Sequence, residues 1–498
     1  MAPRRSSLVT ALGAALTALV FAYIVLRAWS IGLTPDEATT YLVHARATWW
    51  DILTFARPIK SNNHLLNTLL IKISTLAFGD SEFVIRLPAL GGAVLYLVST
   101  HAVLRRLLPD RLFLAGLTLL VVNPFLIEFL SLARGYALGL GFMMASVFYL
   151  VRWVEEPESE RAASRLTVAL ALLAIAVLAV LPFLNVWAGV VSTIVVLTVL
   201  GLLGQPFSGR MLLRLARGLA PGVILLVLVL LFQIYRFFRH REFYYGGREG
   251  FFENTIGSLV SSLSYSNPHI PEILVQSGRW LAVGLVVACG LVGIRLIVQR
   301  PAIPIARTLL LITGTIVFGA IAISSQHALF GMPYVIGRTA IYFVPLAFLQ
   351  WLVVEAWFTS AQSPGWACRS TTILAYAVSL GIFVHGVQSL NLTHTVAWKG
   401  QADTRAAMQV LASQYQGTCG PPESVVMKVT WWLGPGAEYY KKRFDLGCLK
   451  LVIRQSVPDD VDWLYMSSDA LKTVRLGPLR IVANFALSDT QLAVREPR

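Results

Sequence analysis

The chain has 498 residues, of which 56% are hydrophobic and 13% are charged, and its formal net charge at pH 7 is +15. A soluble protein of average composition is about a quarter charged, and a chain this apolar has too little polar surface to cover soluble domains. The composition excludes a disordered chain, a disulfide-rich scaffold and an ordinary cytosolic enzyme, and it predicts a protein that uses the lipid bilayer as its solvent.

Eleven segments are apolar and long enough to cross a membrane, where a span needs about 20 mostly apolar residues. The first follows Arg4 and Arg5 and has no small-residue cleavage site behind it, so we interpret it as an uncleaved anchor. The stretch 166–204 is too long for one helix, and Pro182 marks the expected turn within it. The expected spans are 8–26, 87–104, 112–127, 135–151, 166–181, 183–204, 219–235, 280–298, 308–323, 339–358 and 371–388.

A further apolar segment, 64–79, contains polar residues and is expected to lie in the membrane interface as an amphipathic helix. With this segment at the interface, one side of the membrane receives a basic residue at every helix end. These residues are Arg4, Arg5, Arg105, Arg106, Arg111, Arg152, Arg161, Arg165, Arg210, Arg214, Arg217, Arg295, Arg300, Arg307 and Arg369. The positive-inside rule makes that side cytoplasmic. The sequence therefore predicts a multi-pass protein of the plasma (inner) membrane, with a cytoplasmic N-terminus. Topology accounts for much of the positive charge, and no basic stripe for nucleic acid appears.

The first outer loop begins with the run Thr34-Pro35-Asp36-Glu37, directly after the first span. An acidic pair this close to a bilayer is costly unless it is used or well hydrated. One interpretation is structural, with Thr34 or Asp36 capping the helix that begins after Pro35 and Glu37 in its first turn. The other is functional, with a carboxylate acting as a general base at the membrane surface.

Cations and amide groups follow in the same loop. Arg57, Lys60 and His64 stand close together, and Asn62 and Asn63 lie between the last two. A base, several cations and amide donors in one interfacial loop form the set that an acidic lipid head group would require as a substrate.

The segment after residue 390 is predicted to be a small extracytoplasmic α/β domain, 391–498, attached to a transmembrane domain, 1–390. Helical spacing occurs over 402–416, and the segments 424–430, 449–454 and 461–466 alternate like strands. Cys419 and Cys448 both lie in this domain, where an oxidising compartment permits a disulfide, so we predict that they pair. Two buried thiols are the alternative. No Cys/His spacing is typical of a zinc site, and no glycine-rich phosphate loop is present.

The chain resembles a known fold family. An Asp-Glu pair outside the first span, two juxtamembrane helices and Arg86-Leu87-Pro88 at the second span resemble the GT-C glycosyltransferases. The most similar branch is family 39-like, which includes dolichyl-phosphate-mannose-protein mannosyltransferase-like proteins and bacterial enzymes that use polyprenyl-phosphate sugars.

Two further elements support the resemblance. The run around Arg134 is similar to an Ala-Arg-x-Tyr-Ala-Leu element of that branch, and the run from Arg338 resembles its later Arg/Tyr/Pro element. The motifs cover 8–151, the likeness is looser to residue 388, and beyond that it is only architectural. The sequence departs from the family at His64. This residue aligns with the family's cationic residue before the second juxtamembrane helix, but the two prolines that often follow that residue are missing here.

The resemblance implies a GT-C fold of about eleven spans and a hexosyl- or pentosyltransferase. Such an enzyme moves a sugar from a polyprenyl-phosphate donor to an acceptor hydroxyl on the outer face, with inversion. Asp36 would be the general base and Glu37 would support it electrostatically. The expected acceptor is a lipid, a polysaccharide or a protein, and membrane lipids are the other expected partners. No cofactor is required, and a divalent metal is compatible with Asp36, Glu37 and His64.

The resemblance also implies that cationic side chains bind the phosphate that leaves in the reaction. These are Arg134, Arg338, His64, Lys60 and Arg57, of which the first two could bind phosphate with two parallel hydrogen bonds. The alternative for each arginine is snorkelling to lipid head groups.

The second outer loop offers three residues for contact with the substrate. Tyr244, Tyr245 and Glu249 surround a pair of glycines, and we interpret this loop as a lid over the site. An interfacial aromatic belt is the alternative.

Two other functions compete with the transferase. A lipid-linked sugar transporter or flippase would place ionisable residues near the middle of the bilayer and would repeat its halves. A non-catalytic envelope assembly protein would use the outer domain as its working part.

Overall fold

The chain divides into two compact units. The computed structural model describes residues 6–56, 60, 62–157, 159–202, 209–299, 304–359, 365–415 and 419–496. The helical unit comprises Met1–Val25, Thr48–Leu70 and Arg86–Leu390. The mixed unit comprises Leu26–Ala47, Ile71–Ile85 and Asn391–Arg498. The mixed unit therefore contains more than the predicted outer domain, because it includes the turn with the acidic pair.

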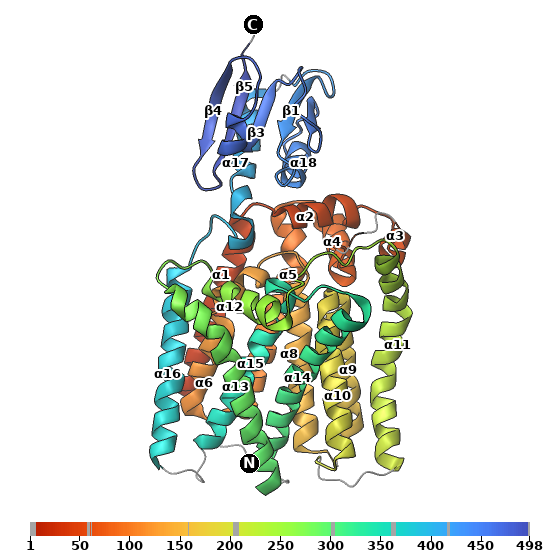
Figure 1. The fold of residues 1–498 in the computed structure, drawn as a ribbon, viewed down its shortest axis with the longest axis vertical. Coiled ribbons are helices and arrows are strands. Elements are labelled where there is room, and N and C mark those ends of the chain that lie inside the picture. The colour runs from red at the N-terminus through yellow and green to blue at the C-terminus, as the bar shows by residue number, and fades with distance from the viewer. Residues whose placement is uncertain are drawn as a thin grey trace. The chain divides into compact units, whose positions relative to one another are not determined.

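Long helices dominate the helical unit (Figure 1). Its helices, some of which continue into the mixed unit, are α1 (Ser7–Ser30), α3 (Trp49–Thr54), α4 (Leu65–Phe78), α5 (Glu82–Leu107), α6 (Asp110–Val121), α7 (Pro124–Leu130), α8 (Tyr136–Glu155), α9 (Ala162–Ala179), α10 (Leu184–Val199), α11 (Gly209–Arg239), α12 (Ser258–Ser264), α13 (Glu272–Gln299), α14 (Pro304–Phe330), α15 (Phe343–Phe358) and α16 (Gly365–Gln388). Three short non-α turns join them, η2 (Leu181–Phe183), η3 (Phe251–Gly257) and η4 (Gly337–Ala340).

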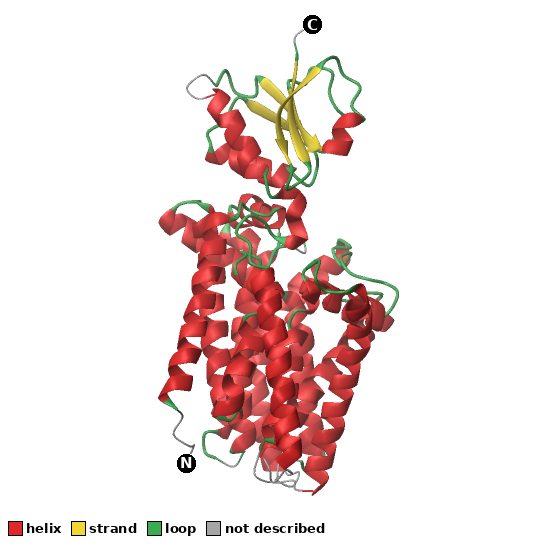
Figure 2. Cartoon of the chain, turned by 90° about the vertical axis from the view of Figure 1, so that its left-hand side faces the viewer, coloured by secondary structure: helices red, strands yellow, loops and turns green. Residues whose placement is uncertain are grey.

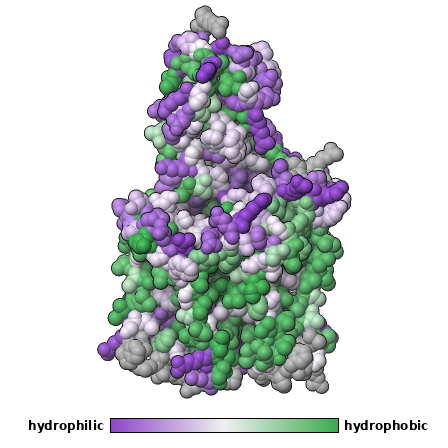
Figure 3. All heavy atoms as spheres, in the orientation of Figure 1, coloured by the Kyte–Doolittle hydropathy of each residue, from purple (hydrophilic) through white to green (hydrophobic). Residues whose placement is uncertain are grey.

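The long helices make this an integral membrane protein. Among the described residues, nine helices are long and apolar enough to cross a membrane, and the bent pair α6 and α7 makes a tenth if it counts as one span. The helix α15 has 16 residues, is apolar and is mostly buried. Each of the eleven predicted spans thus corresponds to a helix or to the bent pair. Apolar side chains form the surface along the bundle helices (green in Figure 3).

Two prolines shape the bundle, and the sequence predicts a turn only at the first of them. Pro182 lies in η2, between α9 and α10, as expected. The predicted span 112–127 is bent by 61° between α6 and α7. At this bend the side chain of Asn123 accepts hydrogen bonds from the backbone N–H groups of Phe125 (3.0 Å) and Leu126 (3.3 Å). Pro124 begins α7 and has no N–H to continue the preceding helix.

The helix α4 corresponds to the predicted interfacial segment. Its 14 residues extend about 21 Å at 1.5 Å per residue, less than the roughly 30 Å of a hydrocarbon core. Its Lys72 ammonium donates to the carbonyl oxygens of Ala45 (3.1 Å) and Ala47 (2.8 Å).

The mixed unit contains all the strands that the structure describes (yellow in Figure 2). Its elements are α2 (Pro35–Thr39), the π-helix η1 (Thr40–Ala45), the 3₁₀ turn η5 (Val396–Gln401), α17 (Thr404–Tyr415), β1 (Val425–Val429), α18 (Gly434–Arg443), β2 (Leu449–Val452), β3 (Trp463–Ser467), α19 (Ser468–Lys472), β4 (Leu479–Phe485) and β5 (Thr490–Arg495).

These strands form one mixed sheet of order β2-β1-β3-β5-β4. The strands β1, β2 and β3 are parallel, whereas β5 runs antiparallel to β3 and β4. The predicted helix and three strands appear as α17, β1, β2 and β3, while α18, α19, β4 and β5 were not predicted. Cys419 and Cys448, the predicted pair, form a disulfide with their Cα atoms 5.5 Å apart. It ties the segment before β1 to the start of β2.

Candidate functional site

The acidic pair lies on a capped turn whose two carboxylates have different roles. The Glu37 carboxylate accepts from the backbone N–H and the hydroxyl of Thr34, both at 3.0 Å. The Thr34 hydroxyl accepts in return from the backbone N–H of Glu37 at 3.3 Å. This reciprocal pattern is a capping box, which satisfies two helix N–H donors at once. Glu37 is fully buried, whereas Asp36 is half-buried and takes no part in the cap.

The residues after the pair form a π-helix, η1, that is anchored through Asp80. The Tyr41 hydroxyl donates to the Asp80 carboxylate at 3.0 Å, and the Tyr439 hydroxyl of α18 donates to the Asp80 carbonyl oxygen at 2.7 Å. Burial, followed by the Asp80 carboxylate, raises the pKa of Tyr41 to about 12, so the phenol stays protonated at neutral pH. Short π-helical segments are frequent at functional sites.

Arg405 of α17 holds the segment that precedes the acidic pair. Its guanidinium donates to the carbonyl oxygens of Ser30 (3.1 Å) and Ile31 (3.3 Å), which end α1. The same group pairs with the Glu82 carboxylate at 2.9 Å. The last carbonyls of a helix have no partner within the helix, and Arg405 provides two of them with hydrogen-bond donors.

Tyr440 of α18 makes the second contact to this segment. Its hydroxyl accepts from the backbone N–H of Leu33 at 3.0 Å, one residue before the cap at Thr34. The Tyr440 side chain is 1% exposed, and burial raises its pKa. The C-terminal elements of the mixed unit therefore fix the entry to the turn with Asp36.

The helical unit contains the predicted phosphate-binding residues, beginning with Arg134. This residue lies in the short connection between α7 and α8 and is 3% exposed. Its burial argues against the alternative of snorkelling to head groups, since a snorkelling guanidinium lies in water. Gly135, which follows, has φ +76°, and a Cβ there would lie 2.4 Å from the carbonyl oxygen of Ala179. The turn thus depends on a glycine directly after Arg134.

The start of α4 contacts the same connection. The Asn67 amide donates to the carbonyl oxygen of Ala133 at 3.0 Å, and the ring of His64 meets the ring of Tyr136 edge-on with centroids 6.1 Å apart. The structure therefore brings two candidates, His64 and Arg134, to one corner of the helical unit.

Arg338 lies in η4 and packs against the loop that is predicted to be the second outer loop. Its guanidinium carbon lies 4.7 Å from the ring centroid of Tyr245, a cation–π arrangement. Two backbone hydrogen bonds between Gly247 and Tyr334, one in each direction, hold this loop just after Tyr245. Tyr244 and Tyr245 are both exposed beside this bridge.

Glu249 completes the candidate loop. The side-chain oxygen of Asn254 accepts from the backbone N–H groups of Glu249 (2.7 Å) and Gly250 (3.1 Å), which shapes the turn before η3. The Glu249 residue itself is exposed. The structure therefore fixes the backbone of this part of the loop and leaves its side chains at the surface.

The helix α12 links the two arginine regions. At its first residue, the Ser258 hydroxyl accepts from the backbone N–H of Gly337, next to Arg338. Just past its end, the Tyr265 hydroxyl donates to the carboxylate of Glu128 in α7, the helix that leads to Arg134. Both arginines thus depend on one short helix for their support.

The remaining cationic candidates lie in the predicted first outer loop. The Lys60 ammonium pairs with the Glu242 carboxylate at 3.2 Å, and its side chain is 55% exposed. Arg57 lies outside the described residues. Among the side chains that the structure describes, no group of three His, Cys, Asp or Glu is placed to hold a metal ion.

Sequence reasoning missed the supporting residues. Arg405, Tyr440, Asn67 and Glu128 carry no motif, and their partners are distant in the chain. The sequence did contain the signal for the cap, because Thr34-x-x-Glu37 has the spacing of a capping box.

Comparisons with known proteins give the fold. No protein-family model and no curated protein sequence matches the chain. The structure of ArnT from Cupriavidus metallidurans bound to undecaprenyl phosphate is similar, with 13% identity, 97% of each chain covered and a TM-score of 0.51. Its apo form has 14% identity, the same coverage and a TM-score of 0.49. The Archaeoglobus fulgidus oligosaccharyltransferase AglB, with an inhibitory peptide and dolichol-phosphate, has 10% identity and a TM-score of 0.47 over 93% of this chain and 70% of its own. The chain has the GT-C fold of membrane glycosyltransferases.

Proposed function

We propose that the protein is a glycosyltransferase that moves a sugar from a polyprenyl-phosphate donor to an acceptor hydroxyl on the extracytoplasmic face of the membrane. The fold supports this proposal, since the similar ArnT structure contains undecaprenyl phosphate. Fold alone does not establish an activity, so the proposal depends on the chemistry of named residues.

The observation that carries the proposal is the division of roles within the acidic pair. The Glu37 carboxylate is committed to the cap with Thr34, and this cap fixes the turn on which Asp36 lies. A general base must be held in a defined geometry to accept a proton from its substrate. We therefore assign proton transfer to Asp36 and a positioning role to Glu37.

The proposed step is a displacement with inversion. The acceptor hydroxyl gives its proton to the Asp36 carboxylate while its oxygen forms a bond to the anomeric carbon. The bond from that carbon to the phosphate oxygen breaks with its electron pair, which leaves polyprenyl phosphate with one more negative charge. No redox change occurs, and the proton remains on Asp36 until solvent removes it.

The growing negative charge calls for cations near the leaving phosphate. Arg134 is the first candidate, because it is buried and its connection is held by Asn67. Arg338 is the second, with His64 and Lys60 as further contacts and Arg57 as a candidate from the sequence. We place the donor sugar beneath the loop with Tyr244, Tyr245 and Glu249.

Purified protein in liposomes with a panel of radiolabelled polyprenyl-phosphate sugars tests the proposal. We expect wild type to release polyprenyl phosphate from one donor when the acceptor is present, and Asp36→Asn to lose at least a hundredfold in kcat with its melting temperature unchanged. Asp469→Asn, which changes an exposed aspartate of α19, is the matched control and should retain full activity.

Two outcomes would count against the proposal. Full transfer by a folded Asp36→Asn protein would remove the assigned base. Donor movement across the liposome membrane without any glycosidic bond formation would favour the transporter interpretation instead.

A further inference from the structure

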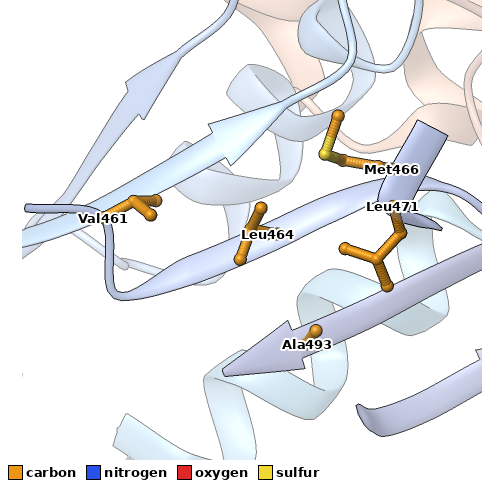
Figure 4. Close-up of a cluster of buried hydrophobic side chains, with 5 residues drawn as sticks. All are labelled: Val461, Leu464, Met466, Leu471 and Ala493. Atoms are coloured by element: carbon orange, nitrogen blue, oxygen red, sulfur yellow. The ribbon is translucent and has the colours of Figure 1, made fainter. Parts of the chain in front are cut away.

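One face of the mixed sheet is only partly covered. On one face of β1 and β3, the Trp463 indole donates to the hydroxyl of Tyr415 in α17, and Tyr465 contacts Thr404 of the same helix. On the opposite face, Leu464 and Met466 join a small apolar cluster that includes Leu471 of α19 (Figure 4). This cluster lies over the β3 and β5 side.

Beside that cluster, over the carboxyl ends of β1 and β2, the structure has an open pocket of about 570 Å³. From β1 the chain passes through α18 to β2 on one side, and it then crosses back to β3 on the other side. Ligands bind in open α/β sheets outside the carboxyl ends of the parallel strands, at the point where the connections diverge, which in this order lies between β1 and β3. The pocket lies at the carboxyl ends of β1 and β2 and extends to Met466 of β3, so it borders that point.

The pocket contains a buried cation. The Lys428 side chain lies on its lining and is 6% exposed. Its ammonium donates to the backbone carbonyl oxygens of Ile453 (3.2 Å) and Gln455. These two hydrogen bonds hold the crossing segment, which is the stretch of chain that leads from β2 to β3. An ammonium group has three N–H donors, so one remains for a ligand. Burial lowers the pKa of Lys428, and a bound anion would offset that penalty.

The pocket also contains a buried hydroxyl without a partner. Thr430 is 8% exposed, and its Oγ1 has no hydrogen-bond partner among the residues that the structure describes. Buried polar groups in proteins are nearly always satisfied. Thr430 directly follows β1, and its backbone N–H donates to the carbonyl oxygen of Tyr465 in β3 at 3.1 Å, which continues the pairing by one residue. Because Thr430 is two residues after Lys428 in this extended segment, both side chains point to the same face.

An exposed aromatic ring and a second cation complete the lining. The Trp431 indole is 62% exposed, and the ring of Trp432 supports it edge-on with centroids 5.8 Å apart. Arg454 and the Gln455 side chain add a guanidinium and an amide. No acidic side chain is among the described residues that line the pocket. An indole face suits the apolar face of a pyranose ring, and two cations suit a carboxylate or a phosphate.

We propose that this pocket binds an acidic saccharide, a sugar with a carboxylate or phosphate group, with Trp431 against the ring and Lys428, Thr430 and Arg454 toward the acidic group. That this saccharide is part of the acceptor rests on the proposed function. The pocket then gives the enzyme specificity for an anionic acceptor glycan, which the fold alone does not imply.

Binding to the full-length protein in detergent tests the site without any transfer reaction. The probes are trigalacturonate and mannose 6-phosphate, with neutral maltotriose and inorganic phosphate as comparisons, measured by isothermal titration. We expect at least one acidic sugar to bind tenfold more tightly than both comparisons. Trp431→Ala and Thr430→Val should each weaken that binding at least fivefold.

Thr430→Val is the decisive variant, because the hydroxyl it removes has no protein partner. The unliganded variant should melt at the wild-type temperature or above it, which separates lost binding from misfolding. Lys428→Met should also weaken binding, but it releases the crossing segment as well. Lys450→Met, at an exposed lysine of β2, and Trp50→Ala, at an exposed indole of α3, are the matched controls.

Three results would overturn the site: equal affinity for maltotriose, equal affinity for inorganic phosphate, or unchanged binding by a folded Thr430→Val protein.

The transferase assay then tests the link to the acceptor. With an acidic acceptor, Thr430→Val should raise KM at least fivefold and leave kcat unchanged. If wild type binds acidic sugars but transfers nothing, the proposed function fails and the site stands. If transfer occurs with the same KM in both proteins, the acceptor assignment fails.

Discussion

The Glu37 carboxylate and the Thr34 backbone N–H and hydroxyl are joined by two hydrogen bonds of 3.0 Å, and this contact determines how the neighbouring Asp36 is held. A helix of five residues, α2, has little stability of its own. The cap and the contacts from Arg405 and Tyr440 therefore supply the order that the proposed base requires.

The first prediction concerns the cap. Thr34→Ala removes the hydroxyl and should destabilise the mixed unit by roughly 0.5–2 kcal/mol, with a lower kcat because the Asp36 turn loosens. Glu37→Gln keeps a side-chain acceptor for the Thr34 N–H and should retain most of the activity. Melting temperature and kcat of both variants check this. If Glu37→Gln is as inactive as Asp36→Asn, Glu37 takes part in proton transfer and is more than a positioning residue.

The second prediction concerns Tyr440. Tyr440→Phe leaves the buried N–H of Leu33 without its acceptor, which costs about 1–3 kcal/mol. We expect a lower melting temperature and a severalfold loss of kcat at unchanged donor KM, because the donor candidates belong to the other unit. Tyr376→Phe, which alters a hydroxyl at α16 in the helical unit, is the control for removal of a phenol and should keep wild-type kcat. A fall in donor affinity alone would contradict this role for Tyr440.

The spans and the acidic pair could be predicted because their signals are local. An apolar run of about 20 residues has few alternatives to a membrane helix, and Asp36 is conspicuous because an acidic residue so close to a span is costly. Arg134 also stood out as a lone charge at a helix end, but its burial could not be read from the sequence, which equally allowed contact with head groups.

The supports of the site could not be predicted because they join residues far apart in the chain. Arg405 and Ser30 are 375 residues apart, and Tyr440 and Leu33 are 407 apart. The helix α18 was missed because it begins with Gly434-Pro435-Gly436, which favours a loop. Burial of its tyrosines against the rest of the unit overrides that local preference.

The third prediction concerns Arg134. If its guanidinium stabilises the leaving phosphate, Arg134→Gln should lower kcat about a hundredfold to a thousandfold, and Arg134→Lys should recover only part of the loss because it lacks the planar fork. Single-turnover assays with saturating donor measure this. The control is Arg369→Gln, at an exposed position near the start of α16. Equal loss in both variants would indicate a general effect on folding or insertion.

The fourth prediction concerns pH. Burial, with the positive charges of Lys399 and Arg27, lowers the pKa of His394 in the folded mixed unit. The folded state therefore disfavours the imidazolium, so its contribution to stability is complete above the unfolded pKa of about 6.5 and is lost as pH falls through the lower folded pKa. We expect the mixed unit to melt at a lower temperature at pH 5 than at pH 7.5. His394→Gln should reduce this difference, and an unchanged difference would exclude His394 as its source.

The last prediction uses two glycines with the same backbone strain and different surroundings. Gly135 has φ +76° and Gly79 has φ +83°, so alanine is strained at either position. A Cβ at Gly135 would also meet the Ala179 carbonyl oxygen at 2.4 Å, whereas a Cβ at Gly79 would meet nothing within 4 Å. Gly135→Ala must therefore move the connection that carries Arg134, and we expect at least a tenfold loss of kcat/KM for the donor. Gly79→Ala should lower the melting temperature slightly and leave kcat/KM within twofold. If both variants lose activity equally, backbone strain alone explains the effect and the close approach at Gly135 does not position Arg134.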